Sequence, residues 1–422
     1  MPTLHARTVE ISDPGDLTSL IPEAGTEAAT TTAVWIRRGD GMVGLGEVAR
    51  YEASPDDPDP IRSADRWWTE FGSAMSVTSL DGVAGSGPVA FGTFCFDPAN
   101  TATVGTLVVP EIVIGRRNGR CWVTLVTDDP AANPSAELVP NPHAESPAPA
   151  SIRWSDGSMN GPEWEVVVAD AVERIRSGVV DKIVLARDVI AETGEPIDLA
   201  GLVRRLSHGY ERCWSYHVDG LVGATPEMLV RRERSLATSR VLAGTIRRTG
   251  SDDQDLALAA ALSQSSKDLS EHEFAVRSVA DALAPYCSGM HVPDSPYVLE
   301  LPNVLHLATD VTAVATDHSS ALSLAAALHP SAAVCGTPTD KARSLIADLE
   351  QMDRGRYAGP VGWVDTHGDG EWGIGLRCGQ LADDRRSIRL YAGCGIVADS
   401  DPTAELAESN AKLVPMRDAL TG

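Results

Sequence analysis

Residues 391–412, YAGCGIVADSDPTAELAESNAK, place the strongest constraint on how this chain folds, because a run of small residues leads directly into an acidic segment. Gly393 and Gly395 flank a cysteine, which is typical of a turn that another part of the molecule approaches closely. An Asp-Pro pair then predicts a helix that begins near Pro402. The fold must therefore bring a tightly packed backbone next to the start of a helix.

The predicted helix carries a pair of acids, and a similar pair occurs upstream. Glu405 and Glu408 are three residues apart, so their carboxylates leave the same helix face. Asp268 and Glu271 have the same spacing on a long helix predicted over residues 256–286. Two such helices together could supply oxygen ligands to Mg²⁺. The alternative is that both pairs are solvated acids, of which those in a first turn complement the helix dipole.

Composition excludes several classes of partner. The chain has 422 residues, of which 43% are hydrophobic and 22% charged, as in soluble globular proteins. A net charge of −24 argues against nucleic acids and anionic membrane surfaces, and no run approaches the roughly 18 apolar residues of a membrane span. The N-terminus lacks a secretory pattern, and seven scattered cysteines without a CxxC pair indicate reduced thiols. We expect a cytoplasmic protein, with a monomer as the default.

Strand and helix patterns interleave along the chain. Alternating residues predict hairpins over 32–51 and 106–127, the second turning at Asn118-Gly119, and the proline-rich residues 128–151 predict a linker. Beyond it we predict helices over 163–178, 256–286, 321–327 and 339–352, and strands over 181–189, 214–218, 223–233, 239–248, 303–314, 361–365, 372–381 and 387–395. The predicted class is α+β or mixed α/β.

Two ionisable residues lie in apolar surroundings. Lys182 belongs to a β-branched strand, and Glu227 belongs to the segment GATPEML. A buried lysine can act as a general base near neutral pH, whereas a carboxyl in an apolar pocket has a raised pKa and can act as a general acid. With a metal, this pair would suit the exchange of a hydroxyl group. The alternative for Lys182 is an edge position from which it reaches solvent.

Arg377 is an isolated charge within the predicted strand 372–381. A charge there needs either a buried acid or a substrate carboxylate held by the guanidinium. Tyr357 could donate to the same anion or could simply pack. His306 and His329 lie in apolar segments, where satisfied core histidines are more common than ligands.

Nine segments occur in the order DKIVLAR, GATPEMLVRR, LAGTIRR, SSKDLSEHEF, PNVLHLAT, LHPSAAVCGTP, RGRYAGPVGWVD, GIGLRC and AGCGIVADSDPTAELAESNAKL. Together they resemble the chorismate-utilising enzymes, which include isochorismate synthase, salicylate synthase, anthranilate synthase component I and aminodeoxychorismate synthase. The resemblance implies two stacked antiparallel β-sheets flanked by helices, with the substrate between them. It also implies that residues 1–150 are a variable, strand-rich N-terminal part of this fold and that residues 151–422 are the chorismate-binding catalytic portion.

The resemblance further implies a magnesium ion bound to the ring carboxylate of chorismate. Glu271 and Glu408 look like its principal ligands, with Asp268 and Glu405 close by or acting through water.

Substrate contacts are implied in the same way. Arg377 and Tyr357 look like the residues that bind the enolpyruvyl carboxylate, helped by backbone amides near Gly393 and Gly395. The other residues expected to line the substrate cleft are Gly244, Thr245, His306, Ala333 and Lys412.

The nucleophile is implied by Lys182. Family members that use ammonia resemble one another in having glutamine at this position, and those that use water have lysine. Water must lose a proton in order to attack, whereas ammonia need not. We therefore expect water to attack ring carbon 2 and Glu227 to protonate the hydroxyl that leaves carbon 4, which gives isochorismate. Aminodeoxychorismate synthases carry a nucleophilic lysine where this chain has Ala243, so a covalent intermediate is not expected.

Two alternatives stay open. Salicylate synthases also use the lysine base and then eliminate pyruvate, but a threonine looks to occupy their equivalent of Ala333, and an alanine there favours stopping at isochorismate. A non-catalytic metal-binding homologue would keep the fold without the activity. Whether the product feeds menaquinone or siderophore synthesis is left open by the sequence.

Overall fold

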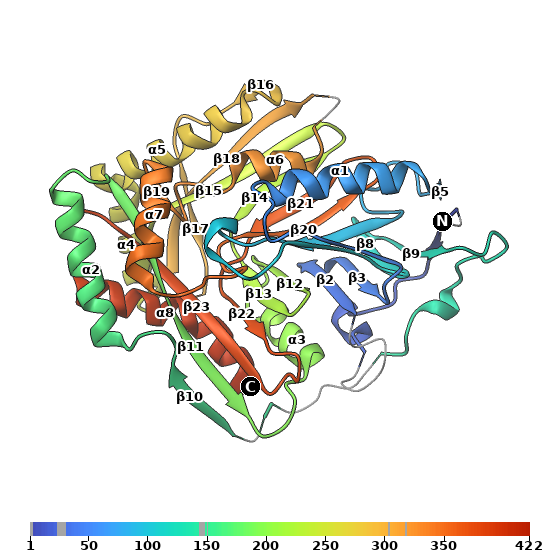
Figure 1. Ribbon diagram of the computed structural model, residues 1–422, viewed down its shortest axis with the longest axis horizontal. Coiled ribbons are helices and arrows are strands. Elements are labelled where there is room, and N and C mark those ends of the chain that lie inside the picture. Colours follow the sequence, from blue (N-terminus) through green and yellow to red (C-terminus); the bar gives the residue numbers. More distant parts are fainter. Residues whose placement is uncertain (1–2, 23–30, 143–147, 150, 303, 317–318) are drawn as a thin grey trace.

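Two large β-sheets face each other, and helices cover them (Figure 1). The computed structural model describes residues 3–22, 31–142, 148–149, 151–302, 304–316 and 319–422. Neighbouring strands are mostly antiparallel, whereas β1 (His5–Ile11) and β5 (Ser76–Thr78) form a parallel pair. This arrangement confirms the predicted α+β class with two stacked antiparallel sheets.

Among the described residues, the first sheet has 13 strands and the second has 10. The first runs β10 (Ile152–Asp156), β11 (Lys182–Thr193), β23 (Ser387–Ile396), β22 (Cys378–Leu381), β13 (Leu221–Thr225), β12 (Trp214–Val218), β2 (Thr32–Arg37), β3 (Asp40–Leu45), β8 (Ile112–Arg117), β9 (Arg120–Thr127), β1 and β5, with β19 (Gly336–Thr337) beside β11. The second runs β16 (Cys287–His291), β18 (Val304–Ala315), β15 (Leu236–Arg247), β14 (Met228–Glu233), β21 (Gly370–Ile374), β20 (Pro360–Asp365), β6 (Val89–Thr93), β7 (Thr106–Val109) and β4 (Ala49–Glu52), with β17 (Tyr297–Glu300) beside β18.

Helices pack on both sheets. The first sheet is contacted by α2 (Gly161–Arg176), α3 (Leu199–Gly209), α7 (Thr339–Glu350) and α8 (Pro402–Thr421). The second is contacted by α4 (Asp252–Gln264), α5 (Ser266–Leu283) and α6 (Ala321–Leu328), and α1 (Pro60–Ser73) packs on α6. Within the described parts of the chain, no helix combines the length and the apolar character needed to cross a membrane.

The N-terminal part contributes strands to both sheets. The predicted hairpin at Asn118-Gly119 joins β8 to β9, and both turn residues have the positive φ that a two-residue hairpin favours. The hairpin predicted over 32–51 ends at β3, because β4 leaves for the second sheet. The helices α1 and α3 were not predicted. Residues 143–147 and 150 of the predicted linker, and residue 303 of a predicted strand, lie outside the described residues.

Two segments predicted as single strands are each divided between the sheets. Residues 223–233 form β13 in the first sheet and β14 in the second, and residues 372–381 form β21 and β22 in the reverse direction. Pro226 has no N–H to continue a ladder, and Arg377 has a φ of +50°, which ends the extended path. Glu227 and Arg377 therefore lie at crossings between the sheets, not within strands as predicted.

The prediction of one continuous helix over residues 256–286 is wrong, because the structure has two helices there. α4 ends at Gln264, and Ser265 is extended with φ −68° and ψ 110°. The Ser265 hydroxyl then caps α5 by accepting a hydrogen bond from the backbone N of Asp268 at 3.3 Å. Gly393 and Gly395 also differ from the prediction, since they lie within β23 and not in a turn.

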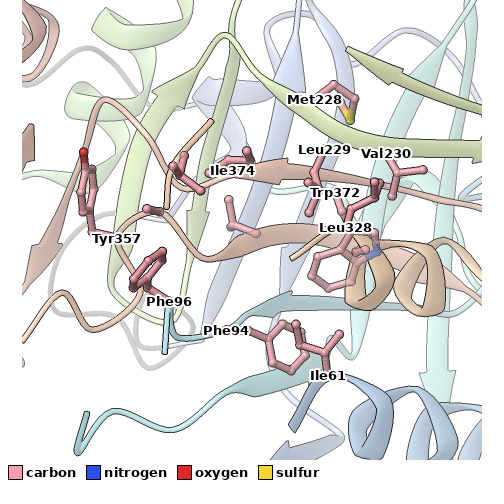
Figure 2. Packing of buried hydrophobic residues seen from close by; sticks show 14 of the residues in the cluster. Ile61, Phe94, Phe96, Met228, Leu229, Val230, Leu328, Tyr357, Trp372 and Ile374 are labelled. Carbon is pink, nitrogen blue, oxygen red and sulfur yellow. The ribbon is translucent and has the colours of Figure 1, made fainter. Parts of the chain in front are cut away.

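Buried aromatic side chains fill the space beneath the second sheet. Figure 2 shows Trp372 beside Leu328 of α6 and above Phe94, and the ring centroids of Phe94 and Trp372 are 5.8 Å apart. Between the sheets, the carboxylate of Glu371 on β21 accepts a hydrogen bond from Trp35 Nε1 of β2 at 2.8 Å. This buried contact links the two sheets.

Candidate active site

One cavity collects the residues that the sequence singles out. Its volume is about 410 Å³, which is typical of a small-ligand site. β11, β23, the two crossings, α5 and α8 contribute to its wall. Every residue predicted for catalysis, substrate binding or metal binding lines it: Lys182, Glu227, Gly244, Thr245, Asp268, Glu271, His306, Ala333, Tyr357, Arg377, Gly393, Gly395, Glu405, Glu408 and Lys412.

The first half of α8 presents two carboxylates to this cavity. The helix begins at Pro402 as predicted, and Asp401 caps it by accepting a hydrogen bond from a first-turn backbone N–H at 2.8 Å. Lys412 Nζ lies 2.6 Å from Glu408 Oε1. Burial acts to raise the pKa of Glu408, but the charges of Lys412 and Arg377 and the hydrogen bonds that the carboxylate accepts together outweigh burial, so this pKa lies below its usual value. Burial raises the pKa of Glu405.

The Lys182 side chain extends from the start of β11 to α5. Its Nζ lies 2.5 Å from Glu271 Oε1, and 15% of the lysine side chain is exposed. It therefore does not take the solvent-facing edge position. Gly395 on the neighbouring strand leaves room for it, because a Cβ there would lie 3.0 Å from Lys182 Cε.

The donor atoms around the cavity suit a hard cation. Among the described residues, one group of potential ligand atoms lies within 4.8 Å of one another, on Cys394, Glu405 and Glu408. Asp268 and Glu271 add two carboxylates to the same cavity from α5. Carboxylate oxygens are the ligands that Mg²⁺ prefers, whereas it does not favour a thiol. The Cys394 thiol instead donates to the backbone O of Glu405 at 3.4 Å.

Glu227 is a buried carboxyl that faces three cations. Burial raises its pKa to about 8, although the charges of Lys182, Lys412 and Arg377 act to lower it. The side chain is therefore mostly protonated at neutral pH, which is the state that a general acid requires. Glu227 directly follows Pro226, where the chain leaves the first sheet and passes through the interior, and only 7% of the residue is exposed.

Arg377 is a buried cation with unused hydrogen-bonding capacity. Its side chain forms no salt bridge with any described residue, and Nη1 is buried without a hydrogen-bond partner among them. Arg377 was expected to pair either with a buried acid or with a substrate carboxylate, and the described residues provide no such acid. A buried guanidinium with a free N–H is a natural partner for a carboxylate that enters the cavity.

Tyr357 lies next to Gly393 in the wall of the cavity. Its ring stacks on Tyr391 with centroids 5.1 Å apart and an interplanar angle of 12°. A Cβ at Gly393 would lie 3.0 Å from the Tyr357 hydroxyl, so glycine allows the phenol to approach the strand. The Gly393 carbonyl accepts a hydrogen bond from Lys412 Nζ at 2.8 Å, so this glycine contacts Lys412 as well as Tyr357.

Both histidines were expected to be satisfied core residues, which is wrong for His306 and confirmed for His329. His306 Nδ1 lies 2.9 Å from Thr245 Oγ1, but Nε2 is buried without a partner among the described residues, so this is not a satisfied core histidine. Burial holds its pKa well below the usual value, which leaves a neutral ring. His329 Nε2, in contrast, is 2.9 Å from the backbone O of Phe96.

Tyr391 and Arg354 are among the lining residues to which sequence reasoning gave no role. Tyr391 provides the stacking partner of Tyr357, and Arg354 lies three positions before Tyr357. The available signal was position: Tyr391 begins the small-residue segment, and Arg354 begins the segment RGRYAGPVGWVD.

The sequence matches the model of a family described as chorismate binding enzyme over residues 6–421. Isochorismate synthase DhbC of Bacillus subtilis is 36% identical over 347 residues, which cover 79% of this chain and 81% of that protein. Isochorismate synthase MenF of the same organism is 28% identical over 407 residues, which cover 90% of this chain and 85% of that protein. The structure of MenF, the menaquinone-specific isochorismate synthase from Escherichia coli, has a TM-score of 0.81 at 24% identity and covers 100% of this chain and 95% of that one, which is a likeness of fold.

Proposed function

Because this chain belongs to the family of chorismate binding enzymes, we propose that it is an isochorismate synthase. In the proposed reaction, water attacks ring carbon 2 of chorismate and the hydroxyl of carbon 4 leaves. The names of the relatives DhbC and MenF support this choice within the family.

The observation that carries the proposal is the state of Glu227. A carboxyl with a pKa of about 8 holds a proton at neutral pH and can donate it to a leaving hydroxyl. Lys182 lines the same cavity and acts on Glu227 through its charge, so an acid and a potential base flank one space. As a base, Lys182 would take a proton from the attacking water, for which it must first leave Glu271 as a neutral amine.

The remaining residues would bind and orient the substrate. Arg377 Nη1 and His306 Nε2 are buried polar atoms without partners among the described residues, and Tyr357 lines the same cavity. These groups suit the enolpyruvyl carboxylate. Asp268, Glu271, Glu405 and Glu408 would hold Mg²⁺, which when bound would neutralise the ring carboxylate of chorismate.

A product assay tests this proposal against its alternatives. The purified protein is incubated with chorismate and Mg²⁺, with and without ammonium, and the products are resolved by chromatography with mass detection. Isochorismate in both reactions is expected. An aminated product would contradict the role of Lys182, and salicylate with pyruvate would favour a salicylate synthase.

The absence of any turnover would favour the non-catalytic homologue. Ala333 supports isochorismate over salicylate as the product. It lines the cavity with a methyl group, whereas a salicylate synthase would be expected to have a threonine hydroxyl at this position. Glu227→Gln serves as the matched control, since it keeps the shape of the side chain and removes the proton that the reaction needs.

A further inference from the structure

A buried ion pair lies in the wall of the cavity, and its arginine lines the cavity. Glu350 ends α7, and Arg354 follows in the loop that leads to Tyr357. Arg354 Nε lies 2.9 Å from Glu350 Oε2 and Nη2 lies 2.5 Å from Oε1, which makes the pair bidentate. The Glu350 side chain is 1% exposed and the Arg354 side chain is 4% exposed. Arg354 also lies over the ring of Phe96, with Cζ 4.2 Å from the centroid.

The pair adds side-chain hydrogen bonds between two pieces of that wall, which also meet directly where the backbone N of Val184 donates to the backbone O of Cys335 at 2.9 Å. On one side, Glu350 Oε1 accepts a hydrogen bond from the backbone N of Ala186 at 2.7 Å, and Arg354 Nη2 donates to the backbone O of Val184 at 2.7 Å. Both acceptor and donor belong to β11, the strand that begins with Lys182. On the other side, Arg354 Nη1 donates to the backbone O of Val334 at 3.1 Å, directly after Ala333.

The guanidinium of Arg354 is therefore occupied by protein groups. Of the two described arginines that line the cavity, Arg377 keeps a buried Nη1 without a partner among the described residues, whereas all three nitrogens of Arg354 donate to the protein. Arg354 thus holds parts of the chain together and is not arranged to bind an anion. Burying two charges costs hydration that an apolar pair would not lose, so stability alone does not account for this choice of residues.

Given the proposed function, we propose that the Glu350–Arg354 pair is a positioning device that sets Lys182 against the Ala333 wall of the cavity. The planar fork of arginine reaches β11 and the Val334 carbonyl at the same time. It thereby adds a side-chain link between the strand that carries the base and the segment that carries Ala333, beside the backbone hydrogen bonds that join β11 to residues 335–337. A lysine at position 354 keeps the charge beside Glu350 but cannot reach both carbonyl oxygens in this geometry.

Arg354→Lys is the direct test, with Arg232→Lys as its matched control. Arg232 Nη1 lies 2.5 Å from Asp369 Oδ1, each side chain is 10% exposed, and neither residue lines the cavity. At a temperature well below both unfolding midpoints, kcat/KM for chorismate should fall about 100-fold in Arg354→Lys, mainly through kcat, and remain near the wild-type value in Arg232→Lys. An unchanged kcat/KM in Arg354→Lys, or equal losses in both variants, would overturn the positioning role.

Hydrogen–deuterium exchange gives a second measurement that does not depend on turnover. Peptides covering residues 182–190 and 331–338 should exchange faster in Arg354→Lys than in the wild type and should be unaffected in Arg232→Lys. Unchanged exchange would overturn the role even if activity were lost. A wild-type protein without turnover would refute the proposed function, and the exchange data would still decide whether the pair holds the wall. If Arg354→Lys does not fold, Glu350→Gln replaces it in both measurements. Its amide oxygen can still accept the hydrogen bond from the backbone N of Ala186, so we expect changes in kcat/KM and exchange in the same direction but smaller than those for Arg354→Lys.

Discussion

Lys182 Nζ lies 2.5 Å from Glu271 Oε1, so the proposed general base and a proposed metal ligand are paired with each other. An ammonium in such a pair has no lone pair with which to accept a proton, and the carboxylate is already partly neutralised. A cation bound by Glu271 would compete with Lys182 for the same oxygen. Loading of the metal and release of the lysine are therefore expected to be coupled.

Lys182→Met tests this coupling. Without its ammonium the variant should bind Mg²⁺ between about two and ten times more tightly, because a partly buried ion pair contributes on the order of 1 kcal/mol. Titration calorimetry measures the affinity without requiring turnover, which this variant should lack. Lys341→Met removes an exposed lysine outside the cavity and provides the control. A weaker or unchanged affinity in Lys182→Met would contradict a role for Glu271 in holding the metal.

The pH dependence of catalysis should report Glu227. Since burial raises the pKa of this carboxyl to about 8, the acid form is present below that pH and is lost above it. We expect kcat/KM to decline as the pH rises through about 8. Glu227→Gln should lower kcat by at least about 100-fold, as for the loss of a general acid. An alkaline limb that persists unchanged in the residual activity of Glu227→Gln would assign the titration to another group.

The same carboxyl should affect stability with a definite sign. Its pKa is about 8 in the folded protein against 4.5 as the ordinary value, so the folded state holds the proton more tightly. Its contribution to stability is complete below about pH 4.5 and is lost as the pH rises through about 8. Glu227→Gln should therefore be more stable than the wild type at pH 9, by on the order of a few kcal/mol, with little difference near pH 4. Denaturant unfolding at both pH values measures this, and an equal effect at both would exclude the raised pKa.

Gly395→Ala should impair the reaction without unfolding the protein. The added Cβ would meet Lys182 Cε at 3.0 Å, which is the far part of a flexible side chain, and so displace the amine. We expect a fall in kcat of about 10-fold or more with an unfolding midpoint close to that of the wild type. Gly194→Ala, where an added Cβ has nothing within 4 Å, is the control. Wild-type kcat in Gly395→Ala would show that the observed position of Lys182 is not the one that matters.

Sequence reasoning located the cavity residues but not the path of the chain that unites them. The nine segments include every lining residue predicted. Glu227 and Arg377 were nevertheless assigned to the interiors of strands, because the residues before and after each of them are apolar and do not show which sheet they join. Pro226 was the local signal for one crossing. Ser265 is compatible with a helix interior as well as with a cap, so the break between α4 and α5 depends on how α5 packs against β15 and β18. That His306 Nε2 is buried without a partner in the described parts of the chain could not be read from its apolar neighbours in the sequence.

The most direct test of the account is to run the reaction with chorismate in water enriched in oxygen-18 and to measure the mass of the isochorismate formed. Attack of water at carbon 2, with Lys182 as base and Glu227 as acid, predicts that one labelled oxygen atom enters each product molecule and is located at carbon 2. Isochorismate without label would mean that the hydroxyl moves within the substrate, which would contradict the proposed roles of both residues.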